Sequence, residues 1–276
     1  MKPRTARDAR GFTLVELLVV IAILSTLAGI LLPVIGSMRG QGRQAAEVSA
    51  GRQIIAAYTA YAADNDGSLL PAYGNFPAAD DRGNALHNPV NARYAWRLAP
   101  YLHYDIGVLY GKIGDDRLHA DRRRDYDSWV YAVSVGPAFG INARFVGGDY
   151  QGFSPEARKA VAAYGKFCVT RMSQAVQPAR LIAFTTAAFE APGGRVPGYF
   201  RVEAPSAVGR VWESAYQKGR SPDAYGHVDF RYGDRAIAVM LDGHVELLDF
   251  TQMDDMRRWS NQAAELDLPN FTLGGN

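Results

Sequence analysis

A single cysteine, Cys168, occurs among the 276 residues. One cysteine excludes a disulfide within the chain and argues against a cysteine-based zinc site. Hydrophobic residues make up 48% of the chain and charged residues 21%, which is ordinary for a folded protein. A chain of this size can bury a core that is stable without disulfides, so the scarcity of cysteine does not exclude a place outside the cytoplasm.

An excess of charge of one sign is lacking too. The 30 Lys and Arg residues are nearly balanced by 28 Asp and Glu, which leaves a formal net charge of +2. This balance gives no indication of a nucleic-acid partner. The basic excess is confined to the N-terminus, where Lys2, Arg4, Arg7 and Arg10 are accompanied by one acidic residue, Asp8. A short basic N-terminus is typical of a targeting segment.

Catalytic signatures are missing as well. The sequence has no His-Glu-x-x-His pattern, no Gly-x-Ser-x-Gly elbow and no Gly-rich nucleotide loop. We therefore expect no enzyme, no catalytic residues and no cofactor. His227 and His244 lie near Asp229 and Asp242 in the sequence. A metal there is a weaker alternative to ordinary surface histidines, so no metal site is predicted.

A long hydrophobic run extends from Phe12 to Ile35 and contains one charged residue, Glu16. At about 1.5 Å per residue, a helix of this length exceeds the hydrocarbon core of a bilayer, which is about 30 Å thick. The basic residues before the run favour a cytoplasmic N-terminus, with everything after Ile35 outside. We therefore predict a single-pass transmembrane helix at 12–35 in the cytoplasmic (inner) membrane, in contact with membrane lipid.

Glu16 distinguishes three interpretations of this run. An ordinary secretory signal peptide has a shorter apolar region, about 7–15 residues, followed by a cleavage site with small residues. A plain signal anchor fits the length but leaves Glu16 unexplained, because a carboxylate inside an apolar membrane helix costs roughly 2.5–3.5 kcal/mol. The third interpretation, given next, assigns the Glu16 carboxylate a role in assembly.

The segment Gly11-Phe12-Thr13-Leu14-Val15-Glu16 resembles the class III signal of prepilins: a basic leader, a glycine, a phenylalanine and then a carboxylate. The resemblance implies that a prepilin peptidase removes residues 1–11 by cutting between Gly11 and Phe12. It also implies N-methylation of the new amine of Phe12 and retention of the apolar helix. Glu16 would then pair with the Phe12 amine of a neighbouring subunit, which would favour assembly and set the axial register.

Pro33 lies near the end of the apolar run. A proline inside a helix removes one backbone hydrogen bond and bends the axis. We predict a helix kink at Pro33; the alternative is a helix that ends near Ile35.

A helical stem is predicted at 36–64. Its apolar stripe consists of Val48, Gly51, Ile55, Tyr58 and Ala62, spaced three and four residues apart, and Glu47 is expected to lie off it. The turn-forming segment 64–67, Asp-Asn-Asp-Gly, stops the helix. A calcium loop is the weaker interpretation of this segment, because the further ligands of an EF-hand are missing.

The remaining residues, 65–276, are predicted to form a globular α+β head. Strands are expected at 129–135, 180–189 and 199–202, and helices at 96–102, 154–164 and 253–259. The charged stretch 115–127 is expected to be a solvated loop.

A β-hairpin at 235–249 is the clearest predicted element of the head. Its apolar strands are joined by Asp242-Gly243, a strong hairpin turn signal. This region resembles the C-terminal H-X9-DG module of a large group of bacterial prepilins, but Tyr232 stands at the signature histidine position. Both resemblances imply a pilin-like fold, with a long N-terminal helix packed on a head that contains an antiparallel sheet.

The expected function is a structural subunit of a type IV pilus or of a type II secretion pseudopilus. The large head favours a minor subunit. Its partners would be prepilin peptidase, other pilin or pseudopilin subunits and the inner-membrane assembly machinery, and it would end in a periplasmic or cell-surface filament. The alternative is a membrane-anchored binding protein with a prepilin signal, whose head recognises a glycan, a surface or an ion. An anchored hydrolase lacks any catalytic motif.

Overall fold

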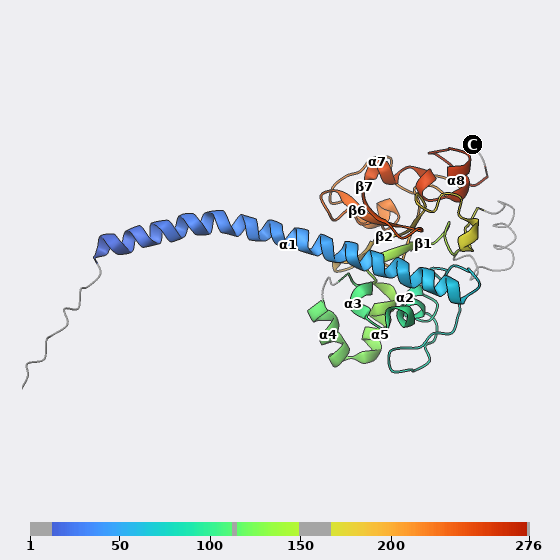
Figure 1. Cartoon of the computed structure of the whole chain (residues 1–276), viewed down its shortest axis with the longest axis horizontal. Coiled ribbons are helices and arrows are strands. Elements are labelled where there is room, and N and C mark those ends of the chain that lie inside the picture. The colour runs from blue at the N-terminus through green and yellow to red at the C-terminus, as the bar shows by residue number, and fades with distance from the viewer. Residues whose placement is uncertain (1–12, 112–114, 149–166, 275–276) are drawn as a thin grey trace, which may run out of the picture. The chain divides into compact units, whose positions relative to one another are not determined.

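The computed structural model describes residues 13–111, 115–148 and 167–274, without the side chains of residues 31–37, 39 and 115–119 (Figure 1). The chain divides into two compact units, Met1–Gln44 and Ala45–Asn276. Helix α1 (Leu14–Asp64) runs through the boundary between them. The predicted leader 1–11 and the predicted helix 154–164 lie outside the described residues.

In the N-terminal unit, α1 is helical from Leu14 onwards and continues through Pro33. The apolar side chains between Leu14 and Ile30 are exposed, with 79% of Leu14 and 64% of Ile30 accessible to solvent. None of the helices in the described part of the chain is both long enough and apolar enough to cross a membrane. The membrane span at 12–35 therefore stays a prediction. The kink at Pro33 stays a prediction as well.

In the second unit, called the head below, the last part of α1 belongs to the hydrophobic core. Ile54 and Tyr58 are completely buried. A methyl group added at Gly51 would lie 2.9 Å from Val239 Cγ2, so the helix packs closely against the strand that carries Val239. The helix ends at Asp64, where the N–H of Gly67, in the left-handed region, donates to the carbonyl of Ala62 over 2.7 Å.

A five-stranded sheet with the order β5-β1-β2-β6-β7 forms the centre of the head. The β1–β2, β2–β6 and β6–β7 pairs are antiparallel, as predicted, whereas β1 and β5 pair in parallel. A separate antiparallel pair, β3–β4, extends beside it. The strands are β1 (Phe139–Asn142), β2 (Ile182–Thr186), β3 (Ala188–Ala191), β4 (Gly194–Pro197), β5 (Arg201–Val202), β6 (Arg235–Met240) and β7 (Val245–Asp249).

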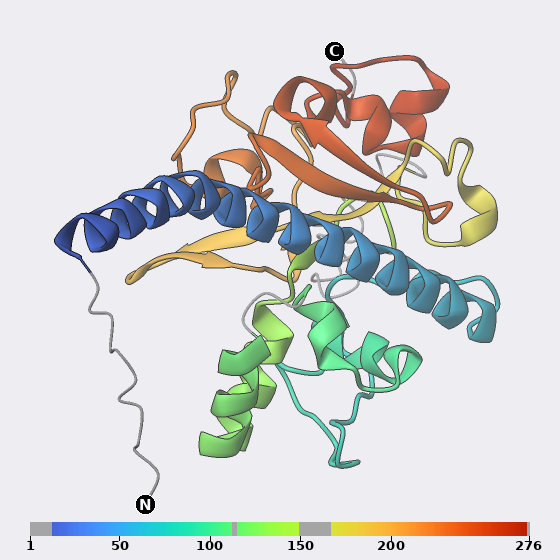
Figure 2. The same cartoon turned by 60° about the vertical axis from the view of Figure 1, so that its left-hand side comes forward.

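Both faces of strand β6 are buried. Ile237 and Val239 pack in one core cluster with α1, whereas Ala238 and Met240 pack in a second cluster with the C-terminal segment. Successive side chains of a strand point to opposite faces, so a central strand covered on both sides is apolar throughout. In Figure 2 the red C-terminal elements and the green helices lie on opposite sides of the head, with the last part of α1 between them.

The green helices include two elements that the sequence analysis assigned wrongly. All the helices of this group are α2 (Tyr94–Leu98), η1 (Ala99–Leu102), α3 (Ile106–Leu109), α4 (Asp115–Arg124) and α5 (Tyr126–Val135), and the two wrongly predicted ones are α4 and α5. The strand predicted at 129–135 belongs to α5, because Asp125 caps the helix by accepting a hydrogen bond from Ser128 N, and Trp129, Val130 and Val133 are buried at helical spacing.

The loop predicted at 115–127 is mostly α4. Acidic residues begin this helix and three arginines end it, a distribution of charge that the helix dipole favours. One of these arginines also has partners in the head: Arg122 forms an ion pair with Asp81, and its guanidinium lies 5.0 Å from the ring centre of Trp129.

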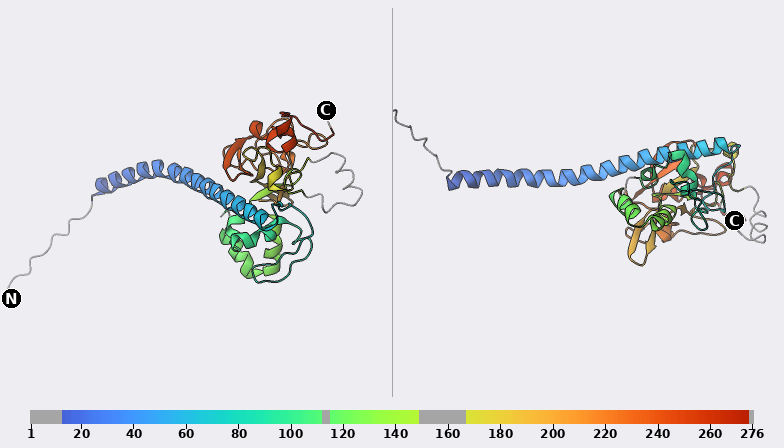
Figure 3. Two further views of the ribbon diagram at one scale, coloured as in Figure 1. Left: turned by 45° about the vertical axis from the view of Figure 1, so that its right-hand side comes forward. Right: turned by 90° about the horizontal axis from the view of Figure 1, so that it is seen from below.

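The C-terminal segment consists of short helices. They are α7 (Phe250–Met253), η5 (Met256–Arg258) and α8 (Asn261–Glu265), seen in red in Figure 3; η3 (Met172–Gln174) and η4 (Pro222–Tyr225) precede them in the chain. The single helix predicted at 253–259 is wrong, because Asp249 and Asp255 cap two separate helices. Trp259 fixes the bend between them by donating from Nε1 to the carbonyl of Met253 over 2.7 Å.

Candidate functional site

The N-terminal signal enters the described structure at Thr13. The Glu16 carboxylate accepts hydrogen bonds from Thr13 N (2.9 Å) and Thr13 Oγ1 (2.8 Å), and Glu16 N donates to Thr13 Oγ1 over 3.2 Å. This is a capping box at the first turn of α1. In the single chain, Glu16 is therefore bonded locally at the helix start. The predicted cleavage residues Gly11 and Phe12 and the side chain of Pro33 lie outside the described part.

A buried charge cluster lies where the head begins on α1. Glu47 is fully buried, and its carboxylate lies beside the Tyr232 side chain without a hydrogen bond of normal geometry to any described residue. Arg231 Nη1 lies 3.5 Å from its Oε1, while Arg231 Nε lies 3.2 Å from Asp229 Oδ2. Burial raises the pKa of Glu47, and the charge of Arg231 offsets only part of this effect.

The expectation that Glu47 lies off the apolar stripe is wrong. Glu47 stands one helical turn before Gly51, so it is on the buried face of α1. Its Cγ comes close to Gly111, where an added methyl group would lie 2.7 Å away. Tyr232, at the signature histidine position, is half-buried, and burial together with the nearby Glu47 carboxylate raises its pKa. The segment that precedes β6 thus meets α1 through Arg231 and Tyr232.

The hairpin turn carries a second polar group. Asp242 and Gly243 lie between β6 and β7, with Gly243 at φ 105°. His244 Nδ1 lies 2.6 Å from Asp242 Oδ1, and its Nε2 lies 3.1 Å from Glu246 Oε1. Burial lowers the pKa of His244, but these two carboxylates outweigh burial and raise it.

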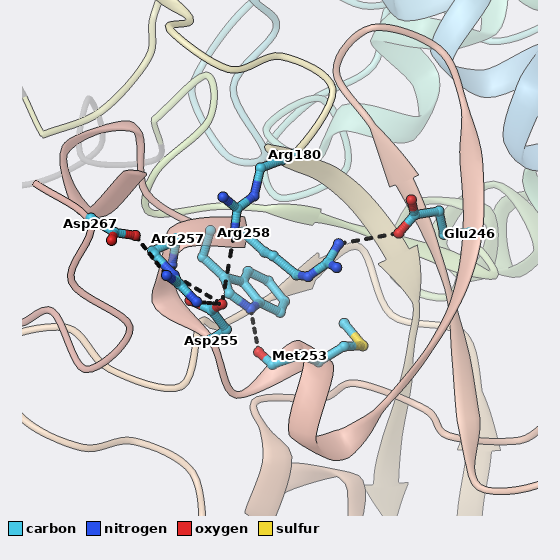
Figure 4. Close-up of polar contacts among 8 residues, drawn as sticks. Arg180, Glu246, Met253, Asp255, Arg257, Arg258 and Asp267 are labelled. Atoms are coloured by element: carbon cyan, nitrogen blue, oxygen red, sulfur yellow. Dashed lines mark hydrogen bonds and ion pairs between the residues drawn. The ribbon is translucent and has the colours of Figure 1, made fainter. Parts of the chain in front are cut away.

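Glu246 also joins the hairpin to the C-terminal segment, as Figure 4 shows. Arg258 Nη1 lies 3.1 Å from Glu246 Oε2, and Arg257 binds Asp255 (2.7 Å) and Asp267 (2.6 Å). Each acidic side chain of this network therefore has a basic partner. This network of ion pairs holds the C-terminal elements against the sheet.

The two histidines singled out in the sequence do not form one site. His227 lies 2.9 Å from Asp223, whereas His244 is paired within the hairpin turn. Burial lowers the pKa of His227. No group of three or more metal-ligating side chains occurs within residues 13–111, 115–148 and 167–274.

A cavity of about 1050 Å³ opens beside the end of α1. Five of the residues that line it are Phe, Tyr or Trp. The residues that line it are Ala60, Tyr61, Asp64, Asn65, Phe76, Pro77, Ala78, Ala79, Gly83, Ala85, Trp96, Arg97, Pro100, Tyr101, His103 and Tyr104. Sequence reasoning missed this cavity, because 68–93 has no periodic pattern.

Comparison with known proteins identifies one part of the chain. Residues 6–32 match the prokaryotic N-terminal methylation motif. No curated protein and no solved structure gives a significant match. The chain therefore carries a prepilin-type N-terminal methylation motif, and this motif implies processing by prepilin peptidase and assembly with pilin-type subunits.

Proposed function

From the prepilin-type methylation motif at residues 6–32, we propose that this chain is the precursor of a filament subunit. Prepilin peptidase cuts between Gly11 and Phe12, and the amine of Phe12 is then methylated. The motif is the observation that carries the proposal, since it covers the end of the basic leader, the cleavage position and Glu16 together.

The apolar segment 12–35 anchors the precursor in the cytoplasmic membrane in a single pass, with the N-terminus inside and the head outside. The exposed apolar side chains of α1 between Leu14 and Ile30 support this part of the proposal. They need an apolar environment, which lipid supplies before assembly and neighbouring subunits supply afterwards. The inner-membrane assembly machinery would transfer the subunit between these two states.

Glu16 gives the assembled state its register. In a filament the positive amine of Phe12 from a neighbouring subunit competes with Thr13 for the Glu16 carboxylate. A charged partner forms the stronger hydrogen bond, so assembly replaces the local capping box with an ion pair. A type IV pilus and a type II secretion pseudopilus both use such packing. The large head favours a minor subunit of either filament.

The second candidate function is a membrane-anchored binding protein that uses the same signal. The aromatic cavity beside the end of α1 favours it. The two functions are compatible, because one concerns the N-terminal segment and the other concerns the head. Neither requires the chain to be an enzyme.

The experiment that tests the filament proposal measures the mature N-terminus in cells that express a prepilin peptidase. Mass spectrometry is expected to find a peptide that begins with N-methylated Phe12. In the same cells Glu16→Gln is expected to be cleaved normally but to be lost from sheared filaments, whereas Ser25→Ala, a polar change on the same helix, assembles normally. Retention of residues before Phe12, or cleavage after Ile35, would contradict the proposal.

A further inference from the structure

The cavity beside the end of α1 is built entirely within the head. Its wall combines the last turn of α1, the loop that contains Phe76, and the α2–η1 segment. Tyr61 and Asp64 come from α1, Trp96 and Arg97 from α2, and Tyr101 from η1.

Half-buried aromatic rings give the cavity its shape. The rings of Tyr61 and Tyr101 meet edge to face, with centroids 5.6 Å apart and planes at 72°. Phe76 and Tyr104 are half-buried as well. Trp96 anchors the wall from behind, since it is fully buried and its Nε1 donates to Val130 O over 2.9 Å. The two tyrosines therefore form a corner of ring faces and edges beside open space.

Hydrogen-bonding side chains stand among these rings. Asp64 and His103 are exposed, and Asn65 is half-buried. Burial and the Asp64 carboxylate raise the pKa of Tyr101, whose hydroxyl lies near Asp64 and Asn65. The set offers carboxylate oxygens, an amide, an imidazole and a hydroxyl, so it supplies both donors and acceptors.

The exposed charge at the cavity does not favour an anionic ligand. Among the described residues that line the cavity, Arg97 is the one with a permanent positive charge, and its Nη2 donates to the carbonyls of Pro71 (2.7 Å) and Ala92 (3.0 Å). Its Nη1 is enclosed, and the guanidinium lies 5.0 Å from the ring centre of Phe76. Through Nη2, Arg97 therefore fixes the wall of the cavity. The exposed charge is the carboxylate of Asp64, which repels anions.

We propose that this cavity binds a neutral sugar unit of a polysaccharide. The C–H face of a pyranose ring carries weakly positive hydrogens, which are attracted to the negative face of an aromatic ring. The Tyr61–Tyr101 corner supplies such faces, and the sugar hydroxyls bind Asp64, Asn65 and His103. Apolar walls with a few placed polar groups are the usual composition of small-molecule sites.

The test uses the full-length chain in micelles of a zwitterionic detergent, because maltoside and glucoside head groups would compete for the cavity. Calorimetric titrations with cellohexaose, chitohexaose and maltohexaose supply neutral sugars, and hexagalacturonate supplies an anionic one. At least one neutral oligosaccharide is expected to bind, and more tightly than hexagalacturonate. Preferred binding of hexagalacturonate, or no binding of any probe, would overturn the proposal.

Substitutions place the binding in this cavity. Tyr101→Ala and Tyr104→Ala are each expected to weaken binding of the neutral sugar about tenfold, since each removes an aromatic ring from the cavity wall. Tyr101→Phe keeps the ring and is expected to weaken binding less. Tyr131→Ala is the matched control, because Tyr131 is an exposed tyrosine on α5 outside the cavity. Unchanged affinity in both folded alanine variants would overturn the assignment.

Sugar binding does not require cleavage at Gly11, so this test and the test of the N-terminus can fail separately. Thermal unfolding of each variant establishes that the head is folded. If a cavity variant binds sugar normally but no longer co-purifies with other subunits, the cavity is a subunit contact and the sugar proposal is wrong.

Discussion

At the scale of single residues, the two glutamates of α1 have opposite surroundings. Glu16 is exposed and accepts hydrogen bonds from Thr13, whereas Glu47 is fully buried and accepts no hydrogen bond of normal geometry from the described residues. Glu16 can therefore exchange its local partner for a partner on another subunit. Glu47 is held inside the head, where its ionised form is disfavoured by burial.

The raised pKa of Glu47 predicts how stability depends on pH. The folded state keeps the Glu47 proton above the ordinary pKa of 4.5, at which the unfolded chain loses it. Between these two pKa values the folded state binds more protons, so the contribution of Glu47 to the free energy of unfolding falls as pH rises. Glu47→Gln is expected to remove this decline and to make the chain relatively more stable at neutral pH.

Thermal unfolding of both proteins from pH 4.5 upwards measures the effect. Glu265→Gln is the matched control, because Glu265 is an exposed glutamate in α8 and its substitution should leave the pH profile unchanged. A profile in Glu47→Gln that parallels that of the unchanged chain would show that Arg231 keeps Glu47 ionised at no cost.

At the scale of elements, the close approach of α1 to the sheet depends on Gly51. An added methyl group would lie 2.9 Å from Val239 Cγ2 and 3.4 Å from Phe139 Cζ, whereas nothing lies within 4 Å of such a group at Gly42. Gly51→Ala is expected to destabilise the head by about 1–3 kcal/mol through overpacking. Gly42→Ala is the control on the same helix and should not destabilise the chain, since alanine favours helix formation by roughly 1 kcal/mol over glycine.

Chemical denaturation of the two variants measures the difference in the free energy of unfolding. The prediction concerns its sign: one alanine destabilises and the other does not. Equal effects of the two substitutions would mean that α1 can move away from β6 without loss.

The sequence predicted elements well where the pattern was long or where turn residues stood at both ends. The helix stop after Asp64, the β6–β7 pair and the α+β class are examples. Short segments were harder, because Trp129 to Val135 is rich in β-branched and aromatic residues. In this segment the Asp125 cap and the burial of Trp129 favour a helix over a strand.

The candidate sites also differ in how well the sequence predicts them. The signal around Glu16 is contiguous in the sequence, so its residues could be named in advance. The buried contact between Glu47 and Arg231 joins residues far apart in the sequence, and the cavity joins α1 to η1 through an irregular loop. Only the folded chain brings such residues together, since no local period encodes these contacts.

At the scale of the whole molecule, the two units divide α1 between them. The head begins at Ala45, and the buried residues of α1 begin with Glu47 and Ala50. The part of α1 before Ala45 contributes no buried side chain among the residues described there. The helix thus has two tasks: its first part carries the motif, and its last part completes the core of the head.

This division predicts the behaviour of two truncated chains. A fragment 45–276 keeps both core clusters and is expected to unfold cooperatively in the absence of detergent, with a Tm within about 5 °C of the full chain. A fragment 65–276 loses Ile54, Ile55 and Tyr58, which are buried in the first cluster, and is expected not to unfold cooperatively. Calorimetry of both fragments decides the matter. A cooperative transition in fragment 65–276 would mean that the sheet and the C-terminal elements suffice for the fold, and that α1 is attached to the head without being part of its core.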